Sequence, residues 1–182
     1  MLRIFKKILA TGVVTERFSL RSHAEHGNEN ELEQLGIEIK SHIDKKFSGS
    51  IAIRQVDAGS CNGCELEIHA LNNPFYDIER FGVHFVASPR HADVLLVTGP
   101  VSRHMQTALL RTYEATPNPK WVVAVGDCAA CGGEFGVSYA SCGAVSNVIP
   151  VDVTISGCPP TPLALMKGLL GLINAKPTGN IQ

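Results

Sequence analysis

From residue 50 onward, short apolar runs recur along the chain and each is followed by a loop, usually one containing glycine. The expected strands are 51–56, 83–87, 94–98, 121–125 and 151–155. The expected helices between and after them are 65–71, 104–115 and 162–175. Runs such as DVLLVT and WVVAVG are apolar at almost every position, which is typical of strands covered on both faces. Strands that alternate with helices form right-handed crossovers, so we predict an α/β fold with a mostly parallel sheet and helices on both faces.

The first 49 residues have a different pattern. Met1, Ile4, Phe5 and Ile8 follow the one-face spacing of an amphipathic helix, which would lie on a partner subunit, a membrane surface or its own domain. Residues 19–48 are polar and mixed in charge, and predict an exposed extension or linker with a short helix around 31–35. We therefore divide the chain into an N-terminal extension, 1–49, and an α/β domain, 50–182.

Length and charge exclude several classes of protein. The 182 residues suffice for one sizeable core. A net charge of −1 gives no electrostatic basis for nucleic acid as the main partner. No run approaches the ~20 apolar residues of a membrane-spanning helix, and the start lacks the long uncharged stretch of a secretory signal. We expect a cytoplasmic protein whose six cysteines are reduced thiols or metal ligands.

Five of the six cysteines follow expected strands. Cys61 and Cys64 come after the first strand in DAGSCNGC, Cys128 and Cys131 after the fourth in VGDCAACGG, and Cys158 after the fifth in ISGCPPTP. The carboxyl ends of parallel strands share one edge of the sheet, where such folds bind ligands. Residues far apart in the sequence are therefore expected to converge at that edge.

Converging thiolates in a reducing compartment indicate either Zn²⁺ or an iron–sulfur cluster. CNGC and CAAC would supply a formal four-cysteine zinc set, but structural zinc sites usually gather their pairs across roughly 15–20 residues. Nearby glycines would let backbone N–H groups approach an anionic cluster. These glycines are Gly59, Gly63, Gly126, Gly132, Gly133 and Gly157. A cluster is the favoured interpretation, with zinc and a thiol redox site as alternatives.

Four motifs in order, GSCNGCELE, TGPVS, GDCAACGG and GCPPTP, resemble the small subunit of [NiFe]-hydrogenases. They equally resemble the 20-kDa B subunit of the respiratory NADH–quinone reductase, complex I. The resemblance covers roughly residues 50–175. It implies a flavodoxin-like α/β domain that holds one [4Fe–4S] cluster against a large catalytic subunit.

The resemblance also implies which residues bind the cluster. Carried over position by position, the metal and cofactor ligands are Cys61, Cys64, Cys128 and Cys158. Cys131 and Cys142 fall outside the pattern and are interpreted as small structural residues. Ligation by Cys131 would displace Cys158 and strengthen the zinc alternative.

The spacing in the first motif separates the two branches of the family. Complex I B subunits typically carry two adjacent cysteines there, whereas hydrogenase small subunits carry C-x-x-C, as in Cys61-Asn62-Gly63-Cys64. The sequence ends about two dozen residues beyond Cys158 without another cysteine and has no twin-arginine leader. We expect the form found in membrane-bound, complex-I-related hydrogenases of the formate hydrogenlyase type.

The implied function is electron transfer through one proximal cluster in a membrane-associated [NiFe]-hydrogenase. The expected partners are a [NiFe]-type large subunit, a ferredoxin-like polyferredoxin subunit and membrane subunits reached through residues 1–18. The complex would lie peripherally on the cytoplasmic face of the membrane, and the catalytic site itself would belong to the large subunit. Two alternatives stay open: a B-type subunit of a complex-I-like oxidoreductase for quinone or another acceptor, and a zinc-stabilised, non-enzymatic interaction domain.

Polar residues beside the motifs have simpler structural interpretations. Asp57 and Asp127 are expected to brace their loops. Ser102 and Thr161 are expected to cap the helices that follow them. Glu65, directly after Cys64, is expected to be a carboxylate favoured by the helix dipole, with proton relay at a subunit interface as the alternative.

Overall fold

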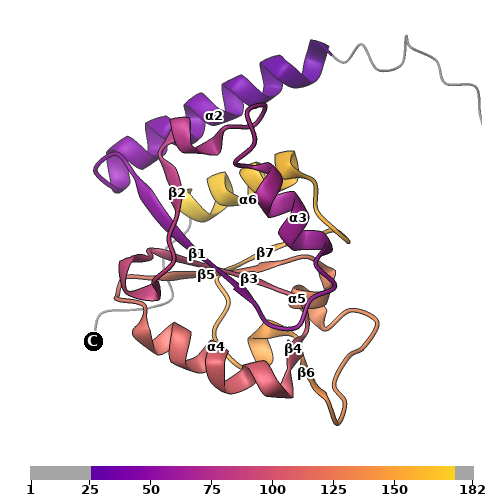
Figure 1. Ribbon diagram of the computed structural model, residues 1–182. Helices are drawn as coiled ribbons and strands as arrows, with labels where there is room; N and C mark the ends of the chain where they lie inside the picture. The colour runs from indigo at the N-terminus through magenta and orange to yellow at the C-terminus, as the bar shows by residue number, and fades with distance from the viewer. Residues whose placement is uncertain (1–25, 175–182) are drawn as a thin grey trace, which may run out of the picture. The chain divides into compact units, whose positions relative to one another are not determined.

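The computed structural model describes residues 26–174. Its main sheet has five strands, all parallel, in the spatial order β2-β1-β3-β5-β7 (Figure 1). The strands are β1 (Ile51–Asp57), β2 (Val83–Phe85), β3 (Val94–Thr98), β5 (Trp121–Val125) and β7 (Val153–Ile155). This order is the flavodoxin-like 2-1-3-4-5 arrangement. The predicted α/β fold class is confirmed.

Helices cover both faces of this sheet. They are α2 (His26–Lys46), α3 (Gly63–Ala70), α4 (Arg103–Ala115), α5 (Asp127–Cys131) and α6 (Pro162–Asn174). In Figure 1, α3 and α6 lie on one face and α4 lies on the other. The sequence predicts α3, α4 and α6 to within two residues at each end. Ser102 caps α4 as expected, since its hydroxyl oxygen accepts a hydrogen bond from the Met105 N–H at 3.3 Å.

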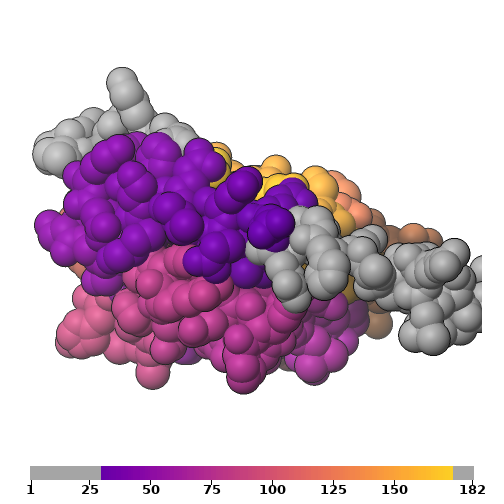
Figure 2. All heavy atoms as spheres, turned by 90° about the horizontal axis from the view of Figure 1, so that it is seen from above, coloured from indigo at the N-terminus to yellow at the C-terminus, as the bar shows by residue number. Residues whose placement is uncertain are grey.

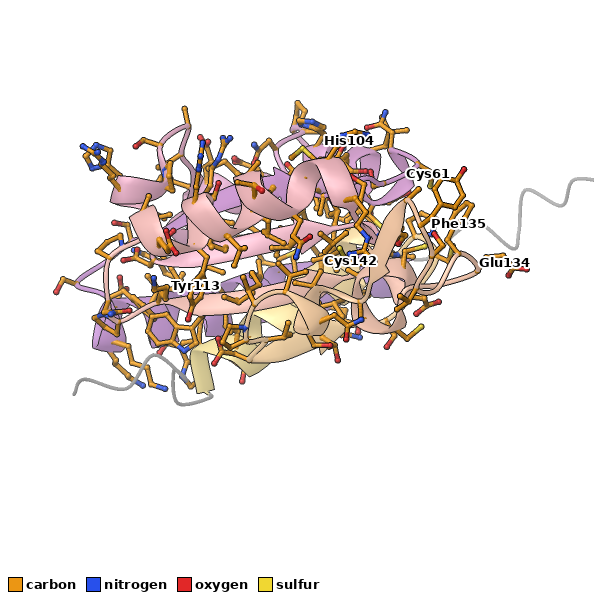
Figure 3. All side chains as sticks on the ribbon, turned by 90° about the horizontal axis from the view of Figure 1, so that it is seen from below. Cys61, His104, Tyr113, Glu134, Phe135 and Cys142 are labelled. Carbon is orange, nitrogen blue, oxygen red and sulfur yellow. The ribbon has the colours of Figure 1, made fainter. Side chains whose placement is uncertain are left out.

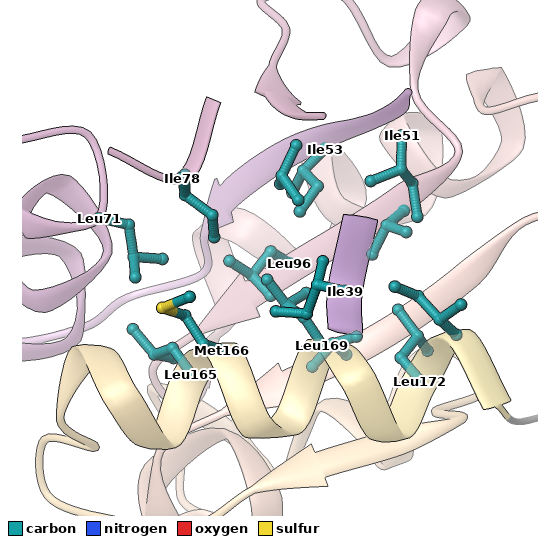
Figure 4. Packing of buried hydrophobic residues seen from close by; sticks show 14 of the residues in the cluster. Ile39, Ile51, Ile53, Leu71, Ile78, Leu96, Leu165, Met166, Leu169 and Leu172 are labelled. Atoms are coloured by element: carbon teal, nitrogen blue, oxygen red, sulfur yellow. The ribbon is translucent and has the colours of Figure 1, made fainter. Parts of the chain in front are cut away.

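Strand residues alternate between the two apolar layers. Val94 and Leu96 of β3 belong to the layer under α6, and Leu95 and Val97 belong to the layer under α4. Figure 4 shows the first layer, where side chains of α6 meet those of the strands and of α2. Because β3 is buried on both faces, every one of its residues had to be apolar or able to find an internal hydrogen bond.

Helix α2 is much longer than the sequence analysis predicts. A short helix was expected around 31–35, but α2 runs from His26 to Lys46. The compact unit that contains the sheet begins at Leu32. One stripe of α2 enters its core, formed by Leu32, Leu35, Ile39 and Ile43. These four residues are spaced as one helical face, and charged residues between them hid that stripe in a composition that is polar on average.

Where α2 packs on the domain, its backbone at Gly36 passes very close to the ring of Phe81. A Cβ built there would lie 2.1 Å from an atom of the Phe81 ring. Beside it, Arg80 forms an ion pair with Glu33 at 2.7 Å. Figure 2 shows α2 lying beside the magenta segment that carries these residues. The expected amphipathic helix at residues 1–8 lies outside the described residues.

The remaining elements are short. The antiparallel pair β4 (Val101–Ser102) and β6 (Ser141–Gly143) lies beside α4, and 3₁₀ turns connect the larger elements in the described part of the chain. The turns are η2 (Ile78–Phe81), η3 (Pro89–His91) and η4 (Val145–Asn147). Sequence analysis missed α5 because five residues are too few for a periodic pattern. Within residues 26–174, no helix has the length and apolar character needed to cross a membrane.

Candidate metal centre

Four cysteines from three separate loops line one cavity at the carboxyl edge of the sheet. Cys61 follows β1 and Cys64 opens α3, while Cys128 lies in α5 after β5 and Cys158 follows β7. All four border a cavity of about 100 Å³. The structure therefore brings together the four residues that the sequence analysis selected. Figure 3 shows Cys61 at this end of the sheet, far from Tyr113 at the other end of α4.

Two aspartates hold the cysteine loops in place. Asp57 Oδ1 accepts hydrogen bonds from the N–H groups of Gly59 and Ser60, both at 2.8 Å, which folds the chain back before Cys61. Asp127 Oδ1 accepts from the Gly157 N–H at 2.9 Å, and the Asp127 N–H donates to the Gly157 carbonyl at 3.0 Å. This second pair ties the loop of Cys128 to the loop of Cys158. Both aspartates brace their loops, as expected.

Glycine is required where the backbone passes the sulfur atoms. Gly126 has φ +85°, and a Cβ built on it would lie 2.6 Å from Cys64 Sγ. Gly133 has φ +55°, and its Cβ would lie 2.7 Å from Cys128 Sγ. Any side chain at either position would be strained and would displace a thiol. The backbone thus forms a close cradle around two of the four sulfurs.

The thiols affect one another electrostatically. Burial raises the pKa of the Cys64 thiol to about 11, with further contributions from Glu65 and from the Cys61, Cys128 and Cys158 thiols. Burial also raises the pKa of Cys128, and the Cys158 and Cys61 thiols add to this shift. Several thiolates in one place are unfavourable unless positive charge compensates them. A bound metal group supplies that charge and deprotonates its thiol ligands.

The donors and the cavity fit a group of several atoms. Four thiolates around one Zn²⁺, each at about 2.3 Å, would place their sulfurs about 3.8 Å apart. Among residues 26–174, no three His, Cys, Asp or Glu side chains are grouped closely enough to hold a single metal ion. The cavity volume is several times the ~10–15 Å³ that one water-sized guest needs. Four thiols around a space of this size suit an iron–sulfur cluster.

The other two cysteines lie outside this cavity. Cys131 is exposed at the end of α5, and its thiol donates to the Asp127 carbonyl at 3.1 Å. Cys142 is buried in the layer under α4, with its sulfur 3.4 Å from Gln106 Oε1. Neither borders the cavity shared by Cys61, Cys64, Cys128 and Cys158, which we call the rim cysteines.

Sequence analysis did not predict a buried hydrogen-bonded pair, Glu65 and Thr98, that lies next to Cys64 in the chain. Glu65 is only 5% exposed, and its Oε1 accepts a hydrogen bond from the Thr98 hydroxyl at the end of β3. Its Oε2 is buried and has no hydrogen-bond partner among the described residues. Glu65 lies in the first turn of α3, as expected for a helix-start carboxylate, but its burial and its hydrogen bond to the sheet were not predicted. The available signal was Thr98, a polar residue that ends an otherwise apolar strand.

Apolar side chains are exposed close to the cysteine edge. Leu66 of α3 is 61% exposed. In the loop after α5, Phe135 is 71%, Val137 70% and Tyr139 97% exposed. In the view of Figure 3, Phe135 is drawn at the same end of the molecule as Cys61. Phe135, Val137 and Tyr139 follow one another in a single loop, and exposed apolar groups concentrated in one loop are typical of a surface that a partner covers.

Comparisons with known proteins agree with this geometry. The chain is 45% identical over 141 residues to formate hydrogenlyase subunit 7 of Escherichia coli, a match that covers 76% of this chain and 55% of that protein. The chain thus spans about half the length of this relative. It is 48% identical over 126 residues to a probable membrane-bound hydrogenase subunit, mbhJ, of Pyrococcus furiosus, covering 69% of this chain and 75% of the relative.

A solved structure shows the same fold with clear sequence identity. It is a chain of the membrane-bound sulfane sulfur reductase, an archaeal respiratory membrane complex, with TM-score 0.62, 36% identity and 75% coverage of both chains. The family model for the NADH ubiquinone oxidoreductase 20 kDa subunit matches residues 61–172, a range that contains all four rim cysteines. The relatives are subunits of oxidoreductases, and the resemblance inferred from the motifs is confirmed. The chain belongs to the NADH ubiquinone oxidoreductase 20 kDa subunit family.

Proposed function

We propose that this protein is an electron-transfer subunit that carries one [4Fe–4S] cluster bound by Cys61, Cys64, Cys128 and Cys158. One observation carries the proposal: thiols from three distant loops border a single cavity large enough for such a group. A cluster of this kind supplies one-electron redox chemistry when bound. The catalytic site for the substrate would lie in a partner subunit.

In this proposal the protein chain positions the group and controls its surroundings. The four thiolates hold it, and the Asp127–Gly157 pair keeps two of the ligand loops together. Gly126 and Gly133 allow the backbone to approach the sulfur atoms, where N–H groups and low polarity tune a redox potential. The buried Glu65–Thr98 pair fixes the start of α3, and hence Cys64, against β3.

We further propose that the complex is a membrane-associated [NiFe]-hydrogenase. The C-x-x-C spacing of Cys61 and Cys64 and the names of two relatives, a formate hydrogenlyase subunit and a probable membrane-bound hydrogenase subunit, support this branch. The alternative is a subunit of a complex-I-like oxidoreductase for quinone or another acceptor. It is favoured by the 36% identity to a chain of the sulfane sulfur reductase complex.

The proposed partners follow from the same reasoning. A [NiFe]-type large subunit would cover the cysteine edge, where Leu66 and Phe135 are exposed. A ferredoxin-like polyferredoxin subunit would exchange electrons with the cluster from its other side. Membrane subunits would be contacted through residues 1–18, and the complex would lie on the cytoplasmic face of the membrane.

The cluster can be tested on the protein alone. After anaerobic reconstitution we expect about four iron and four sulfide per chain and broad absorption near 400 nm that dithionite bleaches, as for thiolate-bound [4Fe–4S] groups. Single Cys→Ser changes at positions 61, 64, 128 and 158 should each reduce the iron content, whereas Cys131→Ser should not. A colourless protein that binds one zinc ion would overturn the proposal in favour of the zinc-stabilised interaction domain.

The identity of the large partner subunit distinguishes the hydrogenase proposal from the complex-I-like alternative. Co-purification of the native complex followed by metal analysis should find about one nickel per complex if the partner is a [NiFe]-type large subunit. Two C-x-x-C pairs in the sequence of that subunit would provide the nickel ligands. A complex without nickel that reduces a quinone would support the alternative.

A further inference from the structure

The exposed arginines of the described residues are unevenly distributed over the molecule. Arg90 lies in η3, which packs against α4, and Arg103 and Arg111 lie on α4 itself. All three are therefore on the side of the sheet opposite α3 and α6 (Figure 1). The remaining exposed arginine, Arg80, lies in η2 beside α2. We call η3 together with the exposed side of α4 the arginine face.

The two sides of the molecule also differ in how their arginines are paired. Arg80 forms an ion pair with Glu33 at 2.7 Å. By contrast, no carboxylate in the described part of the chain forms an ion pair with Arg90, Arg103 or Arg111. The arginine face therefore carries positive charge that the chain itself does not neutralise.

The spacing on α4 directs two of these charges toward the same side. Arg103, Thr107 and Arg111 follow one another at intervals of four residues, which aligns them along one face of the helix. The two arginines are separated by roughly 12 Å along the helix axis. The Arg103 guanidinium donates to the Ser138 carbonyl at 3.4 Å, an acceptor without charge. Glu114 is the one acidic residue of α4, so basic groups predominate on this face.

The arginine face begins beside the cysteine edge. Ser102, which caps α4, packs against the loop that leads to Cys61, since a Cβ built on Gly59 would lie 3.1 Å from Ser102 Cβ. In the view of Figure 3, His104 near the start of α4 is drawn at the same end of the molecule as Cys61. From there the face follows α4 toward η3, which precedes β3 and so lies toward the other end of the sheet.

The composition of this face excludes several kinds of partner. Among the described residues of α4 and η3, no large apolar side chain is exposed. A helix that binds a lipid surface inserts apolar side chains beside its basic ones, and a permanent subunit interface has an apolar core. Three arginines are few for a nucleic acid, whose binding typically uses about six to ten phosphate contacts. The face therefore fits a charged partner that binds weakly.

We propose that the arginine face is the docking surface for an acidic protein that binds reversibly. Each planar guanidinium can bind both oxygens of an Asp or Glu side chain. Complementary charges steer such a partner into place and raise its association rate without making the complex permanent. A protein bound here would lie next to the cysteine edge. The docking does not depend on the cluster proposed above, so the two proposals can fail independently.

The first test measures how the full chain binds labelled poly-L-glutamate of about 20 residues, a probe for an acidic protein surface. We expect saturable binding by fluorescence anisotropy in about 0.1 M salt, where charges more than ~10 Å apart are largely screened, and weaker binding in about 0.5 M salt. Arg111→Glu should weaken binding about tenfold or more, and Arg111→Gln should give a smaller loss. Lys45→Glu is the matched control, because it changes the net charge equally at an exposed position on α2, and it should bind as the wild type does.

Thermal unfolding of the variants separates a binding role from a structural one. Arg111→Glu should remain folded because Arg111 has no ion pair to lose within the described residues. If it does not fold, Arg90→Glu in η3 provides the same readout from a different element. The proposal is overturned if the probe does not bind, or if Lys45→Glu weakens binding as much as the arginine variants do. It is also overturned if phosphatidylserine vesicles or a 20-base-pair DNA duplex bind more tightly than polyglutamate with the same dependence on arginine.

The second test repeats the titration on the native complex. Retained binding that Arg111→Glu and Arg90→Glu weaken supports reversible docking on a face that stays open in the assembly. Loss of binding in the complex would mean that a resident subunit covers the face, which contradicts a reversible partner. Retained binding that neither substitution affects would also contradict the proposal, because the probe would then bind elsewhere.

Discussion

Replacing Gly126 with alanine tests the close cradle around the cysteines. The added Cβ would lie 2.6 Å from Cys64 Sγ on a backbone with φ +85° and ψ 161°, a region that alanine rarely adopts. The backbone strain costs about 1–3 kcal/mol, and the contact adds roughly 1–3 kcal/mol if the thiol does not move. If Cys64 rotates away instead, that second cost is avoided but its sulfur leaves the cavity. The change must therefore reduce either stability or cluster binding.

Gly136→Ala is the matched control, because its φ is +51° and nothing lies within 4 Å of the added Cβ. Denaturant unfolding of the apo chain should place Gly126→Ala about 1–3 kcal/mol below Gly136→Ala, equivalent to about 2–12 °C in a chain of this size. Iron content after reconstitution gives the second readout. If Gly126→Ala unfolds with Gly136→Ala and also binds a full complement of iron, the reasoning about the cradle is refuted.

Three further changes test the surroundings of the site and the packing of α2. Thr98→Val should lower the free energy of unfolding by about 1–3 kcal/mol in urea, because both oxygens of the buried Glu65 then lack a donor; Thr98→Ser, which keeps the hydroxyl, should cost clearly less. Asp127→Ala should cost about 1–3 kcal/mol and speed the loss of iron under a chelator, because it removes the acceptor that joins two ligand loops, and an unchanged rate of iron loss would contradict this role. Ile39→Ala should cost about 2–5 kcal/mol, whereas Ile37→Ala, at a position 58% exposed on the same helix, should stay within about 0.5 kcal/mol of the wild type. Equal effects at these two positions would mean that α2 does not pack through the stripe described above.

Local patterns predicted the parts of the fold that depend on local physics. The strands from Val94 and Trp121 were evident because a strand covered on both faces must be apolar throughout. The helix after Ser102 was evident because its capping residue and its periodic apolar face are close in sequence. Helix α2 was underestimated because its buried stripe is narrow and its average composition is polar, so its stability depends on the core that it meets.

For the candidate site, too, some features could be predicted from the sequence and others could not. The sequence by itself determined which cysteines follow strands, and strand polarity in a parallel sheet requires those loops to share one edge. Only the tertiary structure decided that four thiols border one cavity and that Glu65 bonds to Thr98. These two facts depend on distances between segments far apart in the chain. Such distances follow from how the layers pack, and no local sequence pattern specifies them.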